Sequence, residues 1–266
     1  MSRPNMTAGL SAPGRAAIPN RTLRTDRWWR YPLATAAVLT VVGGYLLYAV
    51  IAGNNYFAEP YLSPMYSPCL SGNCASGVGW GWFASIAPAS PALIVILFPA
   101  AFRATCYYYR KAYYRSFFAS PPACAVAEPA KRYRGESRLP FIIQNVHRYF
   151  WYIALLFAGV LTYDVVIAFR DTSGHWGHAG LGTLIMLINV VLIWLYTVSC
   201  HSCRHITGGR LKHFSRHPLR YRAWTWVSKL NTRHMQFAWA SLVSIAITDL
   251  YIRLLAAGFF ADPRFF

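Results

Sequence analysis

The stretch 179-AGLGTLIMLINVVLIWLYTVSCHSCRH-205 decides the fold class of this chain. Its first 22 residues, Ala179–Cys200, contain no charged side chain. A helix needs about 20 mostly apolar residues to cross the hydrocarbon core of a bilayer, so this segment has the length of a membrane span. Residues 200–205 then bring two cysteines and two histidines together where the span meets a basic loop. The pattern therefore raises the question of a metal site at a membrane surface.

Four other segments share this length and apolar character. They are Tyr31–Gly53, Phe83–Phe102, Tyr149–Phe169 and Met235–Phe260. Five such runs in 266 residues, of which 56% are hydrophobic and only 13% charged, argue against an ordinary soluble core. We expect an all-α integral membrane protein with five transmembrane helices, at about 31–53, 83–118, 141–169, 179–205 and 232–260. These helices would form one bundle over residues 31–260, between an N-terminal tail of residues 1–30 and a C-terminal tail of residues 261–266.

Lysine and arginine are distributed unevenly between the loops. The chain has 26 of these residues against 8 Asp and Glu, and 23 of the 26 lie in residues 1–30, 103–148 and 201–234. The intervening loops hold almost none, since residues 170–178 contain only Arg170. Cytoplasmic loops carry the excess of Lys and Arg in membrane proteins. The sequence therefore predicts a cytoplasmic N-terminus, including the basic tail, and a C-terminus on the outside.

The basic loops also carry many aromatic residues. Thr105–Phe118 interleaves tyrosines with cations and is expected to continue the second helix past the membrane; His213–Leu230 has a similar composition. Lipid headgroups explain part of this composition, because tyrosine and tryptophan are enriched at membrane surfaces. So much aromatic surface in water is unfavourable, which indicates docking to another protein. Nucleic acid is not expected as a partner, because these aromatic residues flank spans.

The six cysteines divide by side of the membrane. Cys69 and Cys74 lie five residues apart in the outer loop, where an oxidising environment favours a disulfide. The other four face the cytoplasm, where free thiols persist: Cys106, Cys124, Cys200 and Cys203. Four thiols on that side are consistent with a metal or an iron–sulfur cluster.

The predicted topology brings several of these thiols to one depth. Cys106 ends the second helix, His147 begins the third and His234 begins the fifth, while Cys200 and Cys203 end the fourth. Around the tip of the hairpin at Ser173, His147 lies 26 residues before and Cys200 lies 27 residues after. The two are therefore nearly level. Ligands at a common depth are what a metal centre inside a helical bundle requires.

Three cofactors bind cysteine or histidine ligands of this kind: haem, zinc and an iron–sulfur cluster. A haem would suit His147 with His234 but would leave the cysteines without a role, and the outer side offers only His175 and His178 for a second haem. Two thiolates with two imidazoles match a structural zinc or a Rieske-type [2Fe–2S] cluster. The residues alone leave both metals open. They also leave open whether His201, His205 or Cys124 replaces one of the expected ligands.

Several stretches resemble one protein family. They are FRATCYYYRKAYYRSFF (102–118), SPPACAVAEP (120–129), LPFIIQNVHRYFWY (139–152), SCHSCRHITGGR (199–210) and YRAWTWVSKLNTRHMQFAWAS (221–241). Together they are similar to the membrane anchor subunit of succinate dehydrogenase from actinobacteria, mycobacteria in particular. The resemblance is greatest to the class in which one five-helix subunit replaces the usual pair of anchors.

This resemblance implies a function and a set of partners. A protein of that class carries a membrane-embedded Rieske-type [2Fe–2S] cluster, lies in the bacterial inner membrane and binds a flavoprotein subunit and an iron–sulfur subunit on its cytoplasmic face. It relays electrons from succinate oxidation to a quinone in the bilayer, for which we expect menaquinone. The chemistry on the dicarboxylate takes place on the partner subunits.

A quinone site near such a relay needs an apolar pocket with a few polar groups. The residues placed for this role are Arg103, Tyr107, Tyr108, Trp151, Tyr152 and Trp239. Two acids lie inside the predicted spans, Asp164 and Asp249, and ionisable groups in spans are candidates for function. Either acid could pair with Arg253. We favour a structural ion pair for them over a proton path from outside.

A protein of a different class would also fit part of the sequence. A membrane scaffold or transporter, stabilised by zinc or binding haem and without redox coupling to succinate, would show a similar charge pattern. An optical or EPR spectrum separates the two, because zinc is silent, haem absorbs strongly and a reduced Rieske cluster has a low average g.

Overall fold

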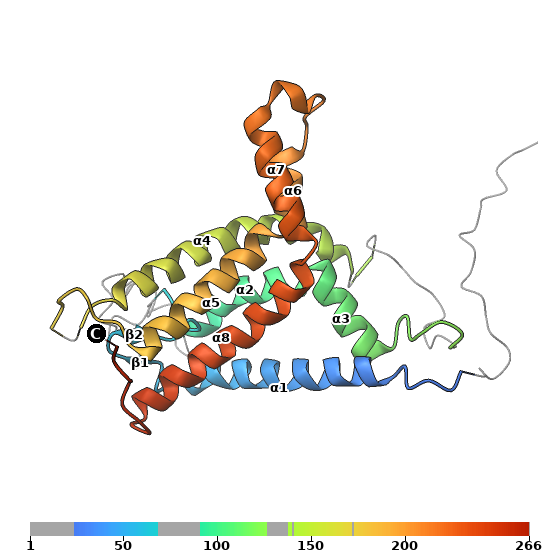
Figure 1. Ribbon diagram of the computed structural model, residues 1–266. Coiled ribbons are helices and arrows are strands. Elements are labelled where there is room, and N and C mark those ends of the chain that lie inside the picture. Colours follow the sequence, from blue (N-terminus) through green and yellow to red (C-terminus); the bar gives the residue numbers. More distant parts are fainter. Residues whose placement is uncertain (1–23, 69–90, 127–137, 140, 172, 266) are drawn as a thin grey trace, which may run out of the picture.

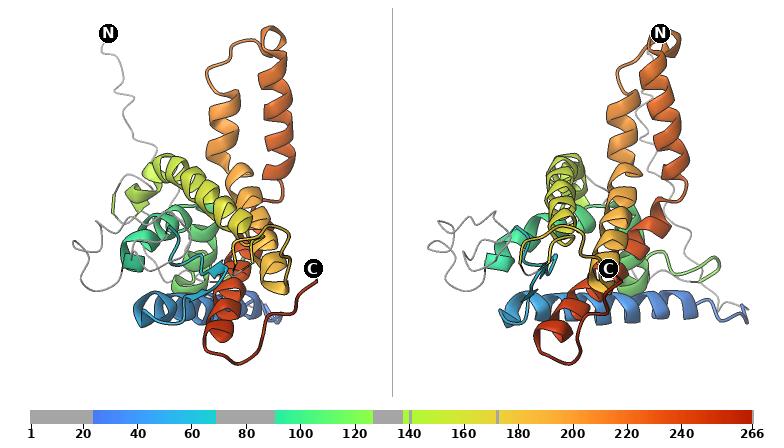
Figure 2. Two further views of the ribbon diagram at one scale, coloured as in Figure 1. Left: turned by 90° about the vertical axis from the view of Figure 1, so that its left-hand side faces the viewer. Right: turned by 60° about the vertical axis from the view of Figure 1, so that its left-hand side comes forward.

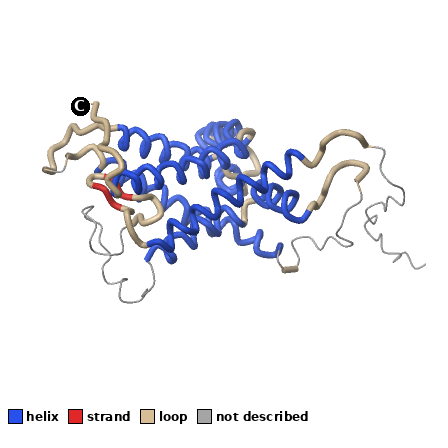
Figure 3. Tube along the Cα trace, turned by 90° about the horizontal axis from the view of Figure 1, so that it is seen from below, coloured by secondary structure: helices blue, strands red, loops and turns tan. Residues whose placement is uncertain are grey.

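The computed structural model describes residues 24–68, 91–126, 138–139, 141–171 and 173–265 of the 266-residue chain. Helices make up most of this part, with only two short strands (Figure 3). Cys69 and Cys74, and with them the expected disulfide, lie outside the described residues. The four described cysteines carry free thiols.

Four helices are long and apolar enough to cross a membrane. They are α1 (Arg30–Ala52), α4 (His147–Ile167), α5 (Leu181–Val198) and α8 (His234–Ala256), and α4 is preceded by a short 3₁₀ turn, η3 (Phe141–Val146). Among them α5 packs against both α4 and α8, and α8 also contacts α1, which lies at an angle to the other three (Figure 1). Large apolar side chains on their outer faces remain exposed, among them Val41 and Leu156. Such an apolar exterior is what a bilayer, and not water, accommodates.

The predicted second span differs from the observed helices. One helix was expected over 83–118; instead, α2 (Pro91–Ala104) ends at Thr105 and α3 (Tyr107–Phe118) leaves in a new direction (Figure 1). Cys106 between them has extended backbone angles (φ −69°, ψ 131°), which no α-helix continues through. With 14 described residues, α2 is too short to be counted among the spanning helices. The five-span count and the orientation of the chain stay predictions.

A second break interrupts the predicted fourth helix. Where one helix was expected over 179–205, α5 ends at Val198 and Cys200 is again extended (φ −62°, ψ 144°). The chain then forms a helical hairpin from α6 (His201–Gly208), the 3₁₀ turn η4 (Phe214–Arg216) and α7 (Pro218–Asn231). This α6–α7 hairpin projects from the bundle crosswise to the spans (Figures 1 and 2).

The two ends of the bundle differ in structure. At the end that we call the basic end, α2 and α5 finish, α4 and α8 begin, and α3 and the α6–α7 hairpin depart. The opposite end is closed by an antiparallel pair, β1 (Phe57–Ala58) and β2 (Tyr61–Leu62). There Tyr61 is buried and its hydroxyl donates to Asp262 at 2.6 Å, which ties the loop to the C-terminal segment.

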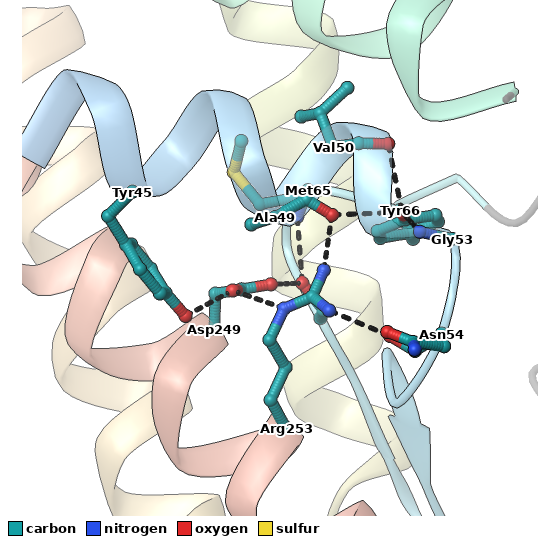
Figure 4. A network of polar contacts seen from close by, with 10 residues as sticks. Tyr45, Ala49, Val50, Gly53, Asn54, Met65, Tyr66, Asp249 and Arg253 are labelled. Carbon is teal, nitrogen blue, oxygen red and sulfur yellow. Dashed lines mark hydrogen bonds and ion pairs between the residues drawn. The ribbon is translucent and has the colours of Figure 1, made fainter.

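A polar network joins α1, α8 and the loop after α1 near this opposite end (Figure 4). Asp249 is fully buried and accepts hydrogen bonds from Arg253 Nε at 2.8 Å, from the Tyr45 hydroxyl at 2.6 Å and from Ser63. Arg253 also donates to the backbone oxygens of α1 and of the following loop.

The pairing of the two intramembrane acids follows the prediction only in part. Arg253 pairs with Asp249, one turn away on the same helix. Asp164 of α4 is bonded instead by the hydroxyl of Ser67, from the loop after β2. The ion pair therefore lies within α8, and α8 is joined to α1 by the hydrogen bonds that Tyr45 makes to Asp249 and that Arg253 makes to the Ala49 carbonyl.

Candidate metal centre

Four of the predicted ligands meet at the basic end of the bundle. Cys106 follows α2, His147 begins α4, Cys200 follows α5 and His234 begins α8. Their exposed fractions are 2%, 8%, 1% and 1%, in that order. Four separate elements therefore bring two thiols and two imidazoles into one buried region.

The four side chains make two sulfur–nitrogen contacts. His147 Nε2 lies 3.2 Å from Cys200 Sγ, and His234 Nε2 lies 3.6 Å from Cys106 Sγ. Each contact joins one thiol to one imidazole from a different helix. Among the described residues, no three His, Cys, Asp or Glu side chains converge on a single point that would hold one metal ion.

The other ring nitrogen of each histidine is held by a hydroxyl. His147 Nδ1 lies 2.9 Å from Thr105 Oγ1, and His234 Nδ1 lies 2.8 Å from Ser199 Oγ. Both hydroxyls already donate their proton to a backbone oxygen in the preceding turn, that of Ala101 at 2.8 Å for Thr105 and that of Tyr196 at 3.1 Å for Ser199.

These bonds favour one tautomer of each histidine. When each hydroxyl donates to its backbone oxygen, it accepts from the histidine, and in that arrangement Nδ1 carries the hydrogen and Nε2 keeps its lone pair. Metal-bound histidines are typically oriented by such an outer hydrogen bond on the second nitrogen. The two imidazoles are thus prepared to bind a metal through Nε2, on the side where the thiols lie.

An aromatic ring supports each histidine. Phe102 stacks on His147 with centroids 4.9 Å apart and an interplanar angle of 3°, and Tyr196 stacks on His234 at 5.0 Å and 17°. Phe102 stands four residues before Cys106, and Tyr196 stands four residues before Cys200.

The site is therefore built from two similar halves. Phe102–Cys106 (FRATC) and Tyr196–Cys200 (YTVSC) share the pattern aromatic, two residues, hydroxyl, cysteine. In each half the aromatic ring and the hydroxyl orient the histidine that starts the next span, while the cysteine faces the other histidine. Sequence reasoning missed this five-residue repeat, although the hydroxyl residue directly before each cysteine was a visible signal of it.

The breaks after α2 and α5 are part of this construction. Each cysteine occupies the extended position that precedes α3 or α6. In a continuous helix, Cys200 and Cys203 would share one face. Because the helix ends before Cys200, the two separate: Cys200 points into the site, and Cys203 is only half-buried on α6.

The remaining candidates lie outside the four-residue set. Cys124 is exposed in the loop after α3. His201 and His205 are exposed on α6, and His205 Nδ1 contacts Arg148 at 3.2 Å. In the described part of the chain, none of these three contacts the four buried side chains through a hydrogen bond.

Burial keeps a thiol protonated, because it raises the thiol pKa. It raises the pKa of Cys200, just beyond the end of α5, to about 12, and the nearby Cys106 sulfur raises it further. Without a metal the Cys200 thiol is therefore neutral. A bound cation reverses this preference, because a coordinating thiol is deprotonated outright. Two buried thiols and two lone-pair-bearing imidazoles fit a Rieske-type donor set, in which His₂ replaces Cys₂ on one iron.

An apolar cavity of about 390 Å³ lies beside these residues, between α1, α2, α3 and α8. Its walls are almost entirely aliphatic, and Gly43 of α1 lines it together with Arg103, Tyr109 and Tyr113 as its polar groups. This volume falls within the range of small-molecule sites.

Arg103 connects the cavity to the candidate ligands. Its guanidinium donates to the Tyr109 hydroxyl at 2.6 Å and to Ser241, and it lies over the ring of Tyr196 at 4.8 Å. Tyr196 in turn stacks on His234. The polar end of the cavity is thus separated from a candidate ligand by one aromatic ring.

The other residues predicted to bind quinone lie elsewhere around the site. Trp151 is buried and donates to the Thr197 carbonyl at 2.8 Å, which is a packing role. Tyr107 and Tyr152 are about half exposed, and Tyr108 places its ring edge near His234. Trp239 packs near Tyr109. Of the six predicted residues only Arg103 lines this cavity, and Tyr109, which lines it too, was not among the six. The quinone-binding residues stay a prediction.

These features define a class: a helical, multi-pass membrane protein with a buried Cys and His set at one end of its bundle. The chain belongs to the family described as actinobacterial succinate dehydrogenase subunit SdhC, which it matches over residues 30–258. It is therefore a membrane subunit of succinate dehydrogenase, complex II of a bacterial respiratory chain. The family and location predicted from the sequence are confirmed.

A solved structure shows the same fold. A chain of the Mycobacterium smegmatis Sdh1 complex in the apo form is 53% identical, and the match covers 96% of this chain and 97% of that chain with a TM-score of 0.84. No curated protein matches this chain.

Proposed function

We propose that this subunit relays electrons from succinate oxidation to a quinone in the bilayer, with a Rieske-type [2Fe–2S] cluster held by Cys106, Cys200, His147 and His234. The observation that carries the proposal is the placement of the two buried histidines, each with Nδ1 within hydrogen-bond distance of a hydroxyl and Nε2 directed at a thiol. When bound, such a cluster supplies a one-electron centre whose potential, about −150 to +300 mV, lies above that of all-cysteine plant-type clusters.

The residues around the ligands would perform three tasks. Thr105 and Ser199 hold the imidazole planes and the tautomers. Phe102 and Tyr196 cover the rings and keep water out of the site. Arg103 presents its guanidinium at the polar end of the cavity, where a carbonyl oxygen of a quinone would accept a hydrogen bond from it. Tyr109 accepts from Arg103 and donates to the Ala238 carbonyl, and so holds the guanidinium in place.

The proposed orientation places the basic end of the bundle in the cytoplasm. The M. smegmatis relative is part of an Sdh1 complex, which supports association of this chain with further Sdh subunits. We propose that an iron–sulfur subunit, itself bound to a flavoprotein, docks at the basic end beside the four ligands. Menaquinone is the proposed acceptor.

The cluster is tested by EPR spectroscopy of the purified complex with two matched variants. Cys200→Ser removes a thiol from the buried set, whereas Cys203→Ser removes a half-buried thiol three residues away. We expect the reduced complex to show a low-average-g signal that Cys200→Ser abolishes and Cys203→Ser retains. An unaltered signal in Cys200→Ser would refute the ligand set, and zinc without any such signal would favour the scaffold alternative.

The cavity is tested by filling it. Gly43 lines the cavity and Gly44 does not, and a side chain at either position meets no atom within 4 Å of its first carbon. We expect Gly43→Phe to lower kcat/KM for quinone by about tenfold or more, the equivalent of a single lost contact of 1.4 kcal/mol. Gly44→Phe should leave it unchanged.

Two readouts make this comparison specific. The low-average-g signal and the reduction of a soluble dye by the partner subunits should be the same in both glycine variants, since neither residue touches the ligands. Equal quinone kinetics for Gly43→Phe and Gly44→Phe would place the quinone outside this cavity.

A further inference from the structure

The α6–α7 hairpin has no role in the site described above. It starts at the level where the spans begin, since Asn231 Nδ2 donates to the Ser199 carbonyl at 2.8 Å and Arg148 of α4 contacts His205. From there it runs crosswise to the spans (Figures 1 and 2). The hairpin thus turns away from the direction in which the spans run, as an element that follows the membrane surface does.

The two helices of the hairpin pack firmly on each other. Arg204 Nε donates to Ser228 Oγ at 3.0 Å, and Arg220 donates to the carbonyls of Ile206, Thr207 and Gly209 at the end of α6. At Gly208 a first side-chain carbon would lie 2.3 Å from the ring of Trp224, so the glycine permits this close approach. The hairpin is therefore a defined element with a fixed outer face.

That outer face carries an apolar stripe. Leu219, Ala223, Trp226 and Leu230 follow each other at spacings of four, three and four residues, which places them on one side of α7. Leu219 is 78% exposed and Trp226 is 69% exposed, so the stripe faces outward and not toward α6. Such apolar exposure is unfavourable in water and needs a covering phase.

Cations accompany the stripe. Residues 201–234 hold eight Lys and Arg and no Asp or Glu. Arg222 and Lys229 lie beside the stripe on α7 and are exposed. Long cationic side chains can keep their charge in the headgroup layer while their stems follow apolar residues into the membrane.

We infer that the α6–α7 hairpin lies in the headgroup layer of the membrane, with the Leu219–Trp226 stripe in the acyl boundary and Arg222 and Lys229 on anionic phospholipid headgroups. A basic helix with tryptophan and leucine on its opposite face is the pattern of an interfacial helix. Each cation near an anionic surface adds about 1 kcal/mol of attraction. The crosswise direction and the absence of acidic residues favour lipid over a protein partner.

Spin-label accessibility in the purified complex tests the inference. A nitroxide at Leu219→Cys reports on the stripe, and one at Tyr221→Cys reports on the opposite side of the same helix; the unsubstituted complex corrects for native cysteines. In nanodiscs of phosphatidylcholine with phosphatidylglycerol, oxygen should reach the label at 219 better than a water-soluble nickel chelate does. The order should be reversed at 221.

A second part of the experiment tests whether the position of the hairpin depends on the attraction between its cations and anionic lipid. Removing phosphatidylglycerol, or introducing Arg222→Gln with Lys229→Gln, should reduce the preference for oxygen at position 219. A label at 219 that the nickel chelate reaches freely would overturn the inference in favour of a solvated hairpin. A label that neither reagent reaches would overturn it in favour of a covering protein subunit, and indifference to both charge changes would overturn the role of anionic lipid.

Discussion

Replacing His147 and His234 together with alanine is expected to lower succinate-driven quinone reduction by at least about a hundredfold, since changes to the outer hydrogen-bonding shell of a metal site alone cost 10- to 100-fold. Both imidazoles are buried and hydrogen-bonded so that Nε2 is available to a metal. The helix starts at these two positions offer no substitute ligand, because the polar groups beside them are a threonine and a serine hydroxyl. The low-average-g EPR signal should disappear with the activity.

Reduction of a soluble dye by succinate separates this effect from a loss of assembly. The dye accepts electrons from the partner subunits, whose centres lie upstream, so its reduction should survive in the double variant. His201→Ala with His205→Ala is the matched control, since both side chains are exposed on α6. If this control lost the signal while the His147 and His234 variant kept it, the exposed pair would be the ligands.

The sequence was sufficient to bring the four candidate ligands to one depth. Alternating charge between loops predicts which helix ends share a side, and equal spacing around Ser173 predicts that His147 and Cys200 are level. The structure places these two side chains 3.2 Å apart. A continuous apolar run of about 20 residues is a strong signal, which is why the segments of α1, α4, α5 and α8 were all found.

The sequence alone did not show which of Cys200 and Cys203 faces the buried histidines. Treating residues 179–205 as one helix puts both thiols on one face, whereas the chain becomes extended at Cys200. Helix propensity gives no warning of such a break, because nothing in SCHSCRH is a glycine or a proline. The break is stabilised by tertiary contacts of Ser199 and Cys200 with two histidines far along the chain.

Contacts between residues far apart in the sequence also determine where the second predicted span ends and which groups bond Asp164 and Asp249. The end of α2 at Thr105 depends on a contact with His147, 42 residues away. Asp249 has its predicted partner Arg253, but Ser63 also bonds Asp249 and Ser67 bonds Asp164, and a search for an opposite charge does not find these serines. Both cases involve hydroxyl groups, whose frequent occurrence makes them weak signals in a sequence.

Replacing Asp249 with leucine is expected to cost about 3–5 kcal/mol of stability, because it leaves the buried Arg253 guanidinium without its counter-charge. Asp249 is fully buried and Arg253 is 7% exposed, so water does not replace the lost partner. The shift should be visible as a lower midpoint of thermal denaturation of the purified complex. Asp249→Asn should cost less, because the amide oxygen still accepts from Tyr45 and Ser63.

A second variant carries Arg253→Met together with Asp249→Leu. It tests whether the stability lost in Asp249→Leu comes from breaking the ion pair. Exchanging both members of a buried pair for apolar residues of similar size is often neutral, in contrast to removing one. The double variant should therefore recover much of the stability, although Tyr45 and Ser63 lose an acceptor. Quinone reduction per intact complex should remain normal throughout, since the network lies at the end of the bundle opposite the four ligands. Reduced turnover in Asp249→Asn with an unchanged denaturation midpoint would instead assign Asp249 to a proton path, because only a protonation role depends on the carboxyl charge without affecting the fold.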